Sequence, residues 1–151
     1  MFITPHTAVA LWLSTKTGNP YLGFTYGLIS HFVIDIIPHG DEKMGYHIED
    51  EKKRRNYILK IGFVDVSLAL ILLYLVWFKT DMWSIVAFWA VAGAWIPDGV
   101  WLLATVIKSK LIKRLAHFHH HTHHLLNKEI GIKSGVLLQF AFTVFFLLLL
   151  F

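Results

Sequence analysis

The chain has 151 residues, which is enough for one domain. Hydrophobic residues make up 56% of it and charged residues only 16%, a balance too apolar for an ordinary soluble domain of this size. The absence of cysteine excludes disulfides, thiolate metal sites and iron–sulfur clusters, so any metal must be held by His, Asp or Glu. The net charge of +4 suits contact with anionic lipid headgroups, and no motif indicates a nucleic-acid-binding protein. The composition therefore predicts an integral membrane protein with a single domain over residues 1–151.

The first predicted element is a short helix over residues 6–15, with Thr4 as its cap and Pro5 in its first turn. It is too short to cross a bilayer core, and the polar residues 16–20 end it.

A second helix is expected over residues 21–37, where Gly23 and Gly27 have the spacing that lets a neighbouring helix pack closely. With the first helix it forms a predicted hairpin. A polar loop follows over residues 39–56 and ends in the basic run at 52–55.

The clearest predicted span covers residues 57–78, about 33 Å long at a rise of about 1.5 Å per residue. It carries one ionisable residue far inside, Asp65. A tight turn at 79–81 leads to a further span over 82–107, which is interrupted by the polar and kinked sequence Ile-Pro-Asp-Gly at 96–99.

The last part of the chain predicts a basic, His-rich helix over residues 108–128 that lies at the membrane interface, then a final span over 132–151. Gln139 is the strongly polar residue inside that span. The predicted fold is thus an all-α, polytopic membrane bundle with a short first helix and an interfacial His-rich helix.

Basic residues are concentrated in the loop after the second helix and in the segment after residue 107, which places both segments on the cytoplasmic side. Counted from that side, several polar residues fall at a similar depth, about 13 Å in the case of Asp98. They come from four helices: His6, His31, Asp35, Asp65 and Asp98. A shared layer of this kind predicts one converging site.

Imidazole and carboxylate ligands without cysteine are typical of metals that activate water, most often Zn, with Mn or Fe as alternatives. An ionisable pair such as His31 and Asp35, one turn apart in an apolar helix, is costly unless it is paired or bound to a metal. The candidate ligands are His6, His31, Asp35, His39, Asp41 and Asp98. A polar network without metal and a proton or ion path remain the alternatives, and Asp65 fits a helix–helix hydrogen bond as well as a site.

Residues 117–124 contain six histidines, in which His119/His123 and His120/His124 share helix faces. One or two of these rings are expected to face the site; a nonspecific metal-buffering stretch is the alternative. A basic patch beside the run is either a topological anchor or a binding surface for a lipid headgroup: Lys108, Lys110, Lys113 and Arg114.

Three short motifs carry a family resemblance: Thr4-Pro5-His6, the sequence Ser-His-x3-Asp-x2-Pro-His-x-Asp over residues 30–41, and Ile96-Pro97-Asp98. They resemble the inner-membrane metal-dependent hydrolases, small multi-span bacterial and archaeal proteins similar to zinc phospholipase C and S1-P1-type nucleases. The resemblance implies a metal-ligand role for the six candidates named above. Where that family often carries His-Arg-x-x-Thr-His-Ser, this chain has His-Thr-His-His at 121–124.

These observations predict a membrane-embedded metal-dependent hydrolase that acts on a phosphoester of a lipid or small molecule at the cytoplasmic face of the inner membrane. A spare carboxylate, Asp41 or Asp98, is the expected general base, and His119 or His123 the group that protonates the leaving group. The alternatives are a membrane protein that binds or transports a divalent metal or protons, and a haem protein with paired histidines. The sequence does not define the oligomeric state.

Overall fold

The computed structural model describes residues 1–41, 44–79, 84–126 and 128–151, and the regular structure in this part of the chain is entirely helical. Its helices are α1 (Ile3–Ser14), α2 (Pro20–Asp35), α3 (Glu51–Lys79), α4 (Ile85–Val106), α5 (Lys110–His123) and α6 (Ile132–Leu148). The predicted all-α class is therefore confirmed.

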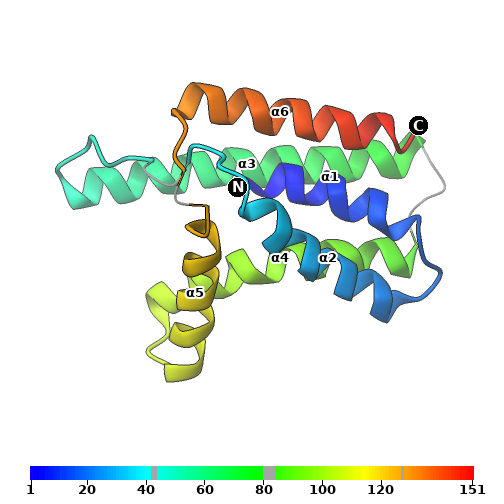
Figure 1. Cartoon of the computed structure of the whole chain (residues 1–151), viewed down its shortest axis with the longest axis horizontal. Helices are drawn as coiled ribbons and strands as arrows, with labels where there is room; N and C mark the ends of the chain where they lie inside the picture. Colours follow the sequence, from blue (N-terminus) through cyan, green and yellow to red (C-terminus); the bar gives the residue numbers. More distant parts are fainter. Residues whose placement is uncertain (42–43, 80–83, 127) are drawn as a thin grey trace.

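The shortest helix, α1, lies at the centre of the molecule. It contacts α2, α3, α4 and α6, and every side chain from Pro5 to Leu11 is buried. In Figure 1, α3 and α6 run alongside α1, whereas α5 crosses the direction of the bundle at one end. The core between α1, α3 and α4 consists mainly of small apolar side chains: Ala8, Ala10, Leu11, Leu72, Val76, Ala87, Ala90, Val91 and Ala94.

Helices α2 and α4 pack closely because glycine lines their contact. Gly27 of α2 lies against the backbone of Ala90, and Gly93 of α4 lies against the backbone of Phe24. A Cβ at either glycine would overlap a carbonyl oxygen of the other helix. The close neighbour expected from the spacing of Gly23 and Gly27 is thus α4, and the contact sets the end of α2 beside the middle of α4.

The first turn of α1 is held by side chains from two other helices. Asp65 of α3 accepts hydrogen bonds from the N–H groups of Ile3 and Thr4, and from the Thr4 hydroxyl at 2.7 Å. Gln139 of α6 accepts from the Phe2 N–H at 2.8 Å. These bonds satisfy backbone donors that a helix start leaves unpaired. The predicted cap at Thr4 is wrong, because the helix starts earlier and Thr4 lies inside its first turn, bound to Asp65.

Helix α2 starts at a side-chain cap and ends ahead of a proline. The side-chain oxygen Oδ1 of Asn19 accepts a hydrogen bond from the Tyr21 N–H at 2.9 Å, and Pro20 occupies the first helical position. The helix ends at Asp35, slightly before the predicted end at residue 37, because the residue before Pro38 disfavours the helical conformation.

Among the described residues, two helices are long and apolar enough to cross a membrane: α3 over Glu51–Lys79, and Ile85–Ala104 of α4. Only 22% of the apolar window of α3 and 39% of that of α4 are buried inside the protein. Helix α6 is also apolar, with 17 residues. These helices correspond to the predicted spans, while the predicted turn at 79–81 falls largely on residues 80–83, outside the described residues.

Several helix boundaries differ from those expected. Helix α3 begins at Glu51 rather than residue 57, because the Asp50 carboxylate accepts from the Lys53 N–H at 2.8 Å and starts the helix before the basic run. Helix α5 is shorter than the predicted segment 108–128, and α6 ends at Leu148.

Candidate metal centre

Histidine and aspartate side chains from four helices meet at the end of the molecule where α5 crosses. They are His6 from α1, His31 and Asp35 from α2, His39 and Asp41 from the segment after α2, Asp98 from α4, and His119 and His123 from α5. On α2 and on α5 the two residues are one turn apart, so each helix directs two side chains at the same place.

Asp35 is the residue on which these contacts converge. Its carboxylate is fully buried, and Oδ1 lies 3.1 Å from Nε2 of His6. Oδ2 lies 3.0 Å from Nε2 of His31, 3.3 Å from that of His119 and 2.9 Å from that of His123. A carboxylate removed from water in this way requires cations or hydrogen-bond donors around it. The four rings surround it on both oxygens.

The spacing of three ligand atoms fits one tetrahedral ion. Nε2 of His31 and Nε2 of His119 are 3.0 Å apart, and Oδ2 of Asp35 lies 3.0 and 3.3 Å from them. Ligands that bind tetrahedral zinc at about 2.0–2.1 Å lie about 3.3 Å from one another. All three side chains are buried, so this set could hold a divalent metal ion.

Backbone carbonyls determine which ring nitrogen of two histidines carries the proton. Nδ1 of His31 lies 2.8 Å from the carbonyl oxygen of Ala94, and Nδ1 of His39 lies 2.7 Å from that of Ile37. Because a carbonyl only accepts, each Nδ1 carries a proton and each neutral ring has its lone pair on Nε2. Metal-binding histidines are commonly oriented in this way. Nε2 of His31 thus directs a lone pair toward the Asp35 carboxylate, an arrangement that a shared cation stabilises.

His39 and Asp41 form a second acid–base pair beside Asp35. Nε2 of His39 lies 2.8 Å from Oδ1 of Asp41. Burial lowers the pKa of His39, but the hydrogen bond and the charge of Asp41, together with the Ile37 carbonyl, raise that pKa above its ordinary value. Burial alone would raise the pKa of Asp41, but the nearby amino terminus and His39 hold that pKa below its ordinary value. Ligand atoms of Asp35, His39 and His123 lie within 4.8 Å of one another, a second group that could hold an ion.

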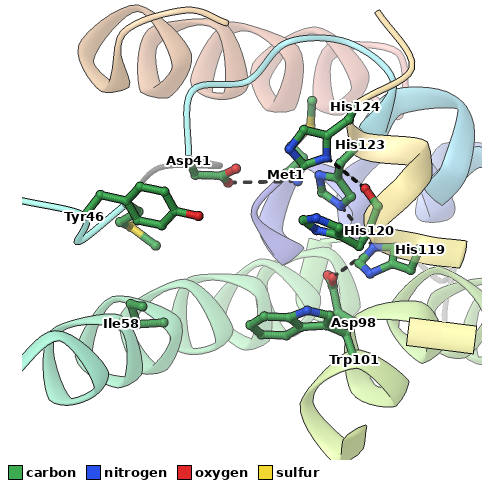
Figure 2. A pocket seen from close by; sticks show the side chains of 11 residues that line it. Met1, Asp41, Tyr46, Ile58, Asp98, Trp101, His119, His120, His123 and His124 are labelled. Carbon is green, nitrogen blue, oxygen red and sulfur yellow. Dashed lines mark hydrogen bonds and ion pairs between the residues drawn. The ribbon is translucent and has the colours of Figure 1, made fainter. Parts of the chain in front are cut away.

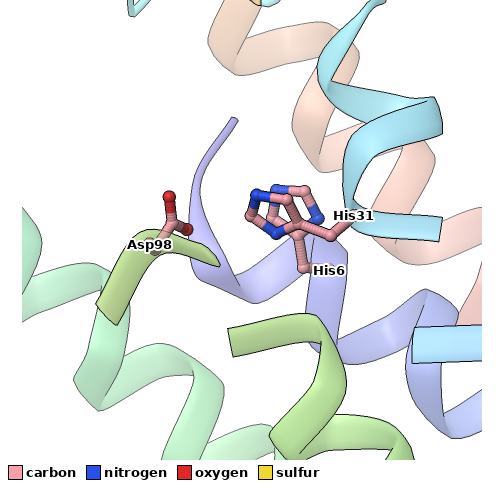
Figure 3. A group of neighbouring side chains, drawn as sticks. All are labelled: His6, His31 and Asp98. Carbon is pink, nitrogen blue, oxygen red and sulfur yellow. The ribbon is translucent and has the colours of Figure 1, made fainter. Parts of the chain in front are cut away.

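A third group joins α1, α2 and α4. Ligand atoms of His6, His31 and Asp98 lie within 4.8 Å of one another. Figure 3 shows the two rings stacked, with Asp98 facing them from α4; the ring centroids are 4.1 Å apart. Among the described residues, Nδ1 of His6 and Nδ1 of His119 are buried polar atoms without a hydrogen-bond partner. The predicted proximity of Asp98 to His31 is therefore present, while the roles of these residues stay predictions.

A cavity of about 330 Å³ opens onto this cluster. Figure 2 shows His119, His120, His123 and His124 grouped together, with Asp98 and Trp101 below them and Asp41 and Tyr46 on the other side. Met44, Ile58 and Trp101 supply apolar wall. The side chain of Asp98 is 24% exposed and that of His123 is 16% exposed, whereas Asp35 is fully buried. The cavity thus reaches the buried cluster through Asp98 and the α5 histidines.

The predicted headgroup patch lies away from this cavity. Lys108, Lys110, Lys113 and Arg114 are exposed, and none of them belongs to the described cavity wall. They occupy the beginning of α5 and the residues before it, while His119 and His123 lie at the other end of the helix. The structure therefore brings together the predicted ligands and the two late histidines, and leaves the basic patch apart.

Two supporting contacts were not predicted from the sequence. The Gln139 amide of α6 donates to the carbonyl oxygen of His39 at 2.8 Å and so holds the segment after α2. The amino group of Met1 lies 2.8 Å from Oδ1 of Asp35 and 2.7 Å from Nε2 of His39. The polar character of Gln139 in an apolar helix is the signal that points to the first contact. No sequence pattern identifies its partner, a backbone carbonyl 100 residues away.

Comparison of the chain with protein-family models, with curated proteins and with solved structures finds no match.

Proposed function

We propose that this protein is a membrane-embedded, metal-dependent hydrolase that cleaves a phosphoester, in keeping with its resemblance to the inner-membrane metal-dependent hydrolases. The observation that carries the proposal is the buried set His31, Asp35 and His119, whose ligand atoms are 3.0–3.3 Å apart. Zinc is the metal that best suits this imidazole and carboxylate set, with Mn or Fe as alternatives.

The exposed apolar surface supports a place in the membrane. The apolar window of α3 is only 22% buried, whereas the core helix of a soluble protein would be mostly covered. Large apolar side chains on its outer surface include Phe63, Leu68, Ile71, Leu75 and Phe78. On this proposal α3, α4 and α6 lie along the membrane normal, and α5, which crosses them at one end, lies at the cytoplasmic interface of the inner membrane (Figure 1).

Each residue of the site has a role in this reaction. The buried rings and Asp35 bind and orient the ion, with the carbonyl of Ala94 holding the His31 ring. A bound divalent ion supplies Lewis acidity, which lowers the pKa of a water and polarises a phosphoryl oxygen. Asp98 reaches the cavity and lies 3.6 Å from Nε2 of His119, so it is the carboxylate best placed to accept a proton. His123, exposed to the same cavity, is the candidate donor to the leaving group.

The cavity wall favours a substrate with an apolar portion. Met44, Ile58 and Trp101 line it beside Asp98 and His123. A lipid phosphoester would set its phosphoryl group at the histidines and its glycerol or acyl portion against these side chains. The basic patch at the start of α5 would then act on the membrane surface, by attracting anionic lipid, rather than inside the cavity.

Metal or proton transport is less consistent with the interior of the bundle. A transport path needs polar side chains on both sides of the site. Beyond the cluster, the described core between α1, α3 and α4 is packed with apolar residues such as Leu11, Leu72 and Val91. Burial of that kind closes the route through the bundle.

The test is hydrolysis by the full chain in detergent micelles, loaded with Zn²⁺, Mn²⁺ or Fe²⁺. The substrates are p-nitrophenyl phosphate, bis(p-nitrophenyl) phosphate, and mixed micelles that contain phosphatidic acid or phosphatidylglycerol. We expect metal-dependent cleavage of a lipid phosphoester that chelator abolishes. Asp98→Asn should lower the rate by about 10²-fold or more while the protein stays folded, because a proton acceptor is lost. Glu49→Gln, at an exposed carboxylate, should retain the rate. Metal-loaded protein that cleaves none of these esters would contradict the proposal.

A further inference from the structure

The His-rich helix has a second histidine face that the buried cluster does not use. His119 and His123 contact Asp35, whereas His120 and His124 are exposed. The rings of His120 and His124 are nevertheless close together, with centroids 4.6 Å apart and planes at 53°. Both rings line the cavity that opens onto the buried cluster (Figure 2).

One ring of this pair is held in a metal-binding tautomer. Nδ1 of His124 lies 2.9 Å from the carbonyl oxygen of His120, so Nδ1 carries the proton and donates it. The lone pair of the neutral His124 ring is therefore on Nε2. A backbone carbonyl that orients the ring through its other nitrogen is the arrangement found around metal-binding histidines.

The cavity leads to the buried cluster. His6, His31 and Asp35 are fully buried, and the cluster meets the cavity at Asp41, Asp98, His119 and His123. On α5, each buried ring is followed directly by a cavity ring: His120 follows His119, and His124 follows His123. Consecutive helix residues differ by about 1.5 Å in rise and about 100° in direction. The exposed pair, His120 and His124, is thus displaced from the buried pair by one residue along the same helix.

We propose that His120 and His124 form a second, weaker site for a transition-metal dication such as Zn²⁺ at the mouth of the cavity, and that this site passes the ion to the buried cluster. Two imidazoles one turn apart chelate such an ion when the rings are held in position, as the His120 carbonyl and the cavity wall hold the pair here, with water completing the coordination. The pair lacks a carboxylate and is exposed, so it binds less tightly and releases the ion inward. Ion binding by the pair stands on its own geometry; the transfer step rests on the proposed function, because it requires the buried metal centre.

Zn²⁺ titration of chelator-stripped full-length protein in detergent, by calorimetry, tests the binding step. Wild type should show a tight and a weaker class of site. His120→Ala/His124→Ala should lose the weaker class and keep the tight one. The matched control is His117→Ala/His121→Ala, an exposed pair with the same spacing that is not part of the described cavity wall; it should retain both classes. Asp35→Asn should lose the tight class and keep the weaker one.

The transfer step is tested by the rate at which stripped protein takes Zn²⁺ from a chromophoric chelator. His120→Ala/His124→Ala should fill the tight class at least about tenfold more slowly, because the local supply of ion is lost, and reach the same final occupancy. An unchanged isotherm and rate in this variant overturns the proposal, and so does an equal loss in His117→Ala/His121→Ala, which indicates nonspecific buffering. If wild type shows the weaker class alone, the transfer step and the proposed function both fail, while the mouth site is still decided by its loss in the double variant.

Discussion

A buried carboxylate that faces several imidazole rings needs positive charge nearby, and Asp35 is such a carboxylate. Rings from three helices approach its two oxygens at 2.9–3.3 Å. The Ala94 carbonyl holds the proton of His31 on Nδ1, so the neutral ring offers its lone pair toward Asp35. Lone pair and carboxylate repel one another unless a proton or a metal ion lies between them. The separations of 3.0–3.3 Å among Nε2 of His31, Nε2 of His119 and Oδ2 of Asp35 fit the metal ion.

Asp65 has a structural role that a variant can separate from metal binding. It accepts hydrogen bonds from the Ile3 and Thr4 N–H groups, and Asn at this position would direct an N–H₂ group at one of these donors. We expect Asp65→Asn to lower the free energy of unfolding by about 1–3 kcal/mol and to retain most of the bound metal. Thermal unfolding in micelles and metal analysis measure the two quantities.

Asp50→Asn is the matched control for this variant, because Asp50 also accepts from a helix N–H, but on the surface and at a position where Asn caps equally well. It should leave the unfolding temperature unchanged. Loss of metal in Asp65→Asn with no loss of stability would contradict the structural role.

Among individual residues, the convergence of the His and Asp side chains could be predicted from the sequence, because an ionisable residue in an apolar helix is costly and needs a partner. The proximity of Asp98 to His31 follows from their similar depth. The sequence could not decide between a structural role and a site role for Asp65. Its partners are backbone N–H groups of α1, and every residue except proline has such a group, so the sequence does not identify them. The rotation of α5 about its own axis decides that His119, and not the ring next to it in the sequence, contacts Asp35. A run of consecutive histidines does not reveal that rotation.

At the scale of elements, the contact between α2 and α4 positions His31. Gly27 lies against the Ala90 backbone on one turn of α2, and His31 bonds to Ala94 on the next. Any substitution that separates the two helices therefore moves the ring away from the carbonyl that fixes its tautomer. The glycines that allow the close contact between α2 and α4 therefore also place His31 at the Ala94 carbonyl.

Gly27→Ala should couple loss of stability to loss of metal affinity. The added Cβ would overlap the Ala90 carbonyl, a form of overpacking that costs about 1–3 kcal/mol. Loss of the His31–Ala94 contact should weaken Zn²⁺ binding by about 10-fold or more. Unfolding temperature and Zn²⁺ affinity, measured on the same preparation, check both effects.

Gly62→Ala in α3 provides the control, since a Cβ there meets nothing within 4 Å. It should retain Zn²⁺ affinity and gain up to about 1 kcal/mol from its higher helix propensity. Equal behaviour of the two alanine variants would rule out the close contact.

Helix boundaries show what periodicity alone provides. The apolar runs locate α3, α4 and α6, because length and composition are local properties. The central position of α1 is not local: the sequence predicts only a hairpin with the second helix, whereas α1 also contacts α3, α4 and α6. Its side chains at Ala8 and Ala10 are small enough to allow that close approach.

At the scale of the whole molecule, α5 crosses the bundle at one end (Figure 1), and its histidines bring the polar cluster and the cavity to that end. The basic residues at the start of α3 and in α5 extend that polar end. In the proposed membrane protein, one polar end and apolar sides would give one orientation in a bilayer.

This orientation predicts which residues are accessible from each side. The chain lacks cysteine, so single cysteines can be introduced without background. Cysteines at Glu49 and Lys113 should react with a membrane-impermeant maleimide from the cytoplasmic side. Those at Lys16 and Ser84, at the other end, should react from the opposite side. If the cysteines at positions 49 and 113 react from different sides, the proposed topology is excluded, and so is a single site formed by the segments that carry them.

The most direct test of the metal centre is the metal content of the purified protein, measured by inductively coupled plasma mass spectrometry. Wild type should retain a stoichiometric amount of Zn, Mn or Fe after gel filtration. The Asp35→Asn variant, nearly isosteric and still folded, should lose most of it, because the Asp35 carboxylate contacts the rings of His6, His31, His119 and His123. His117→Ala/His121→Ala should retain the wild-type content. A wild-type protein without stoichiometric metal, or an Asp35→Asn protein with the full amount, would contradict the account.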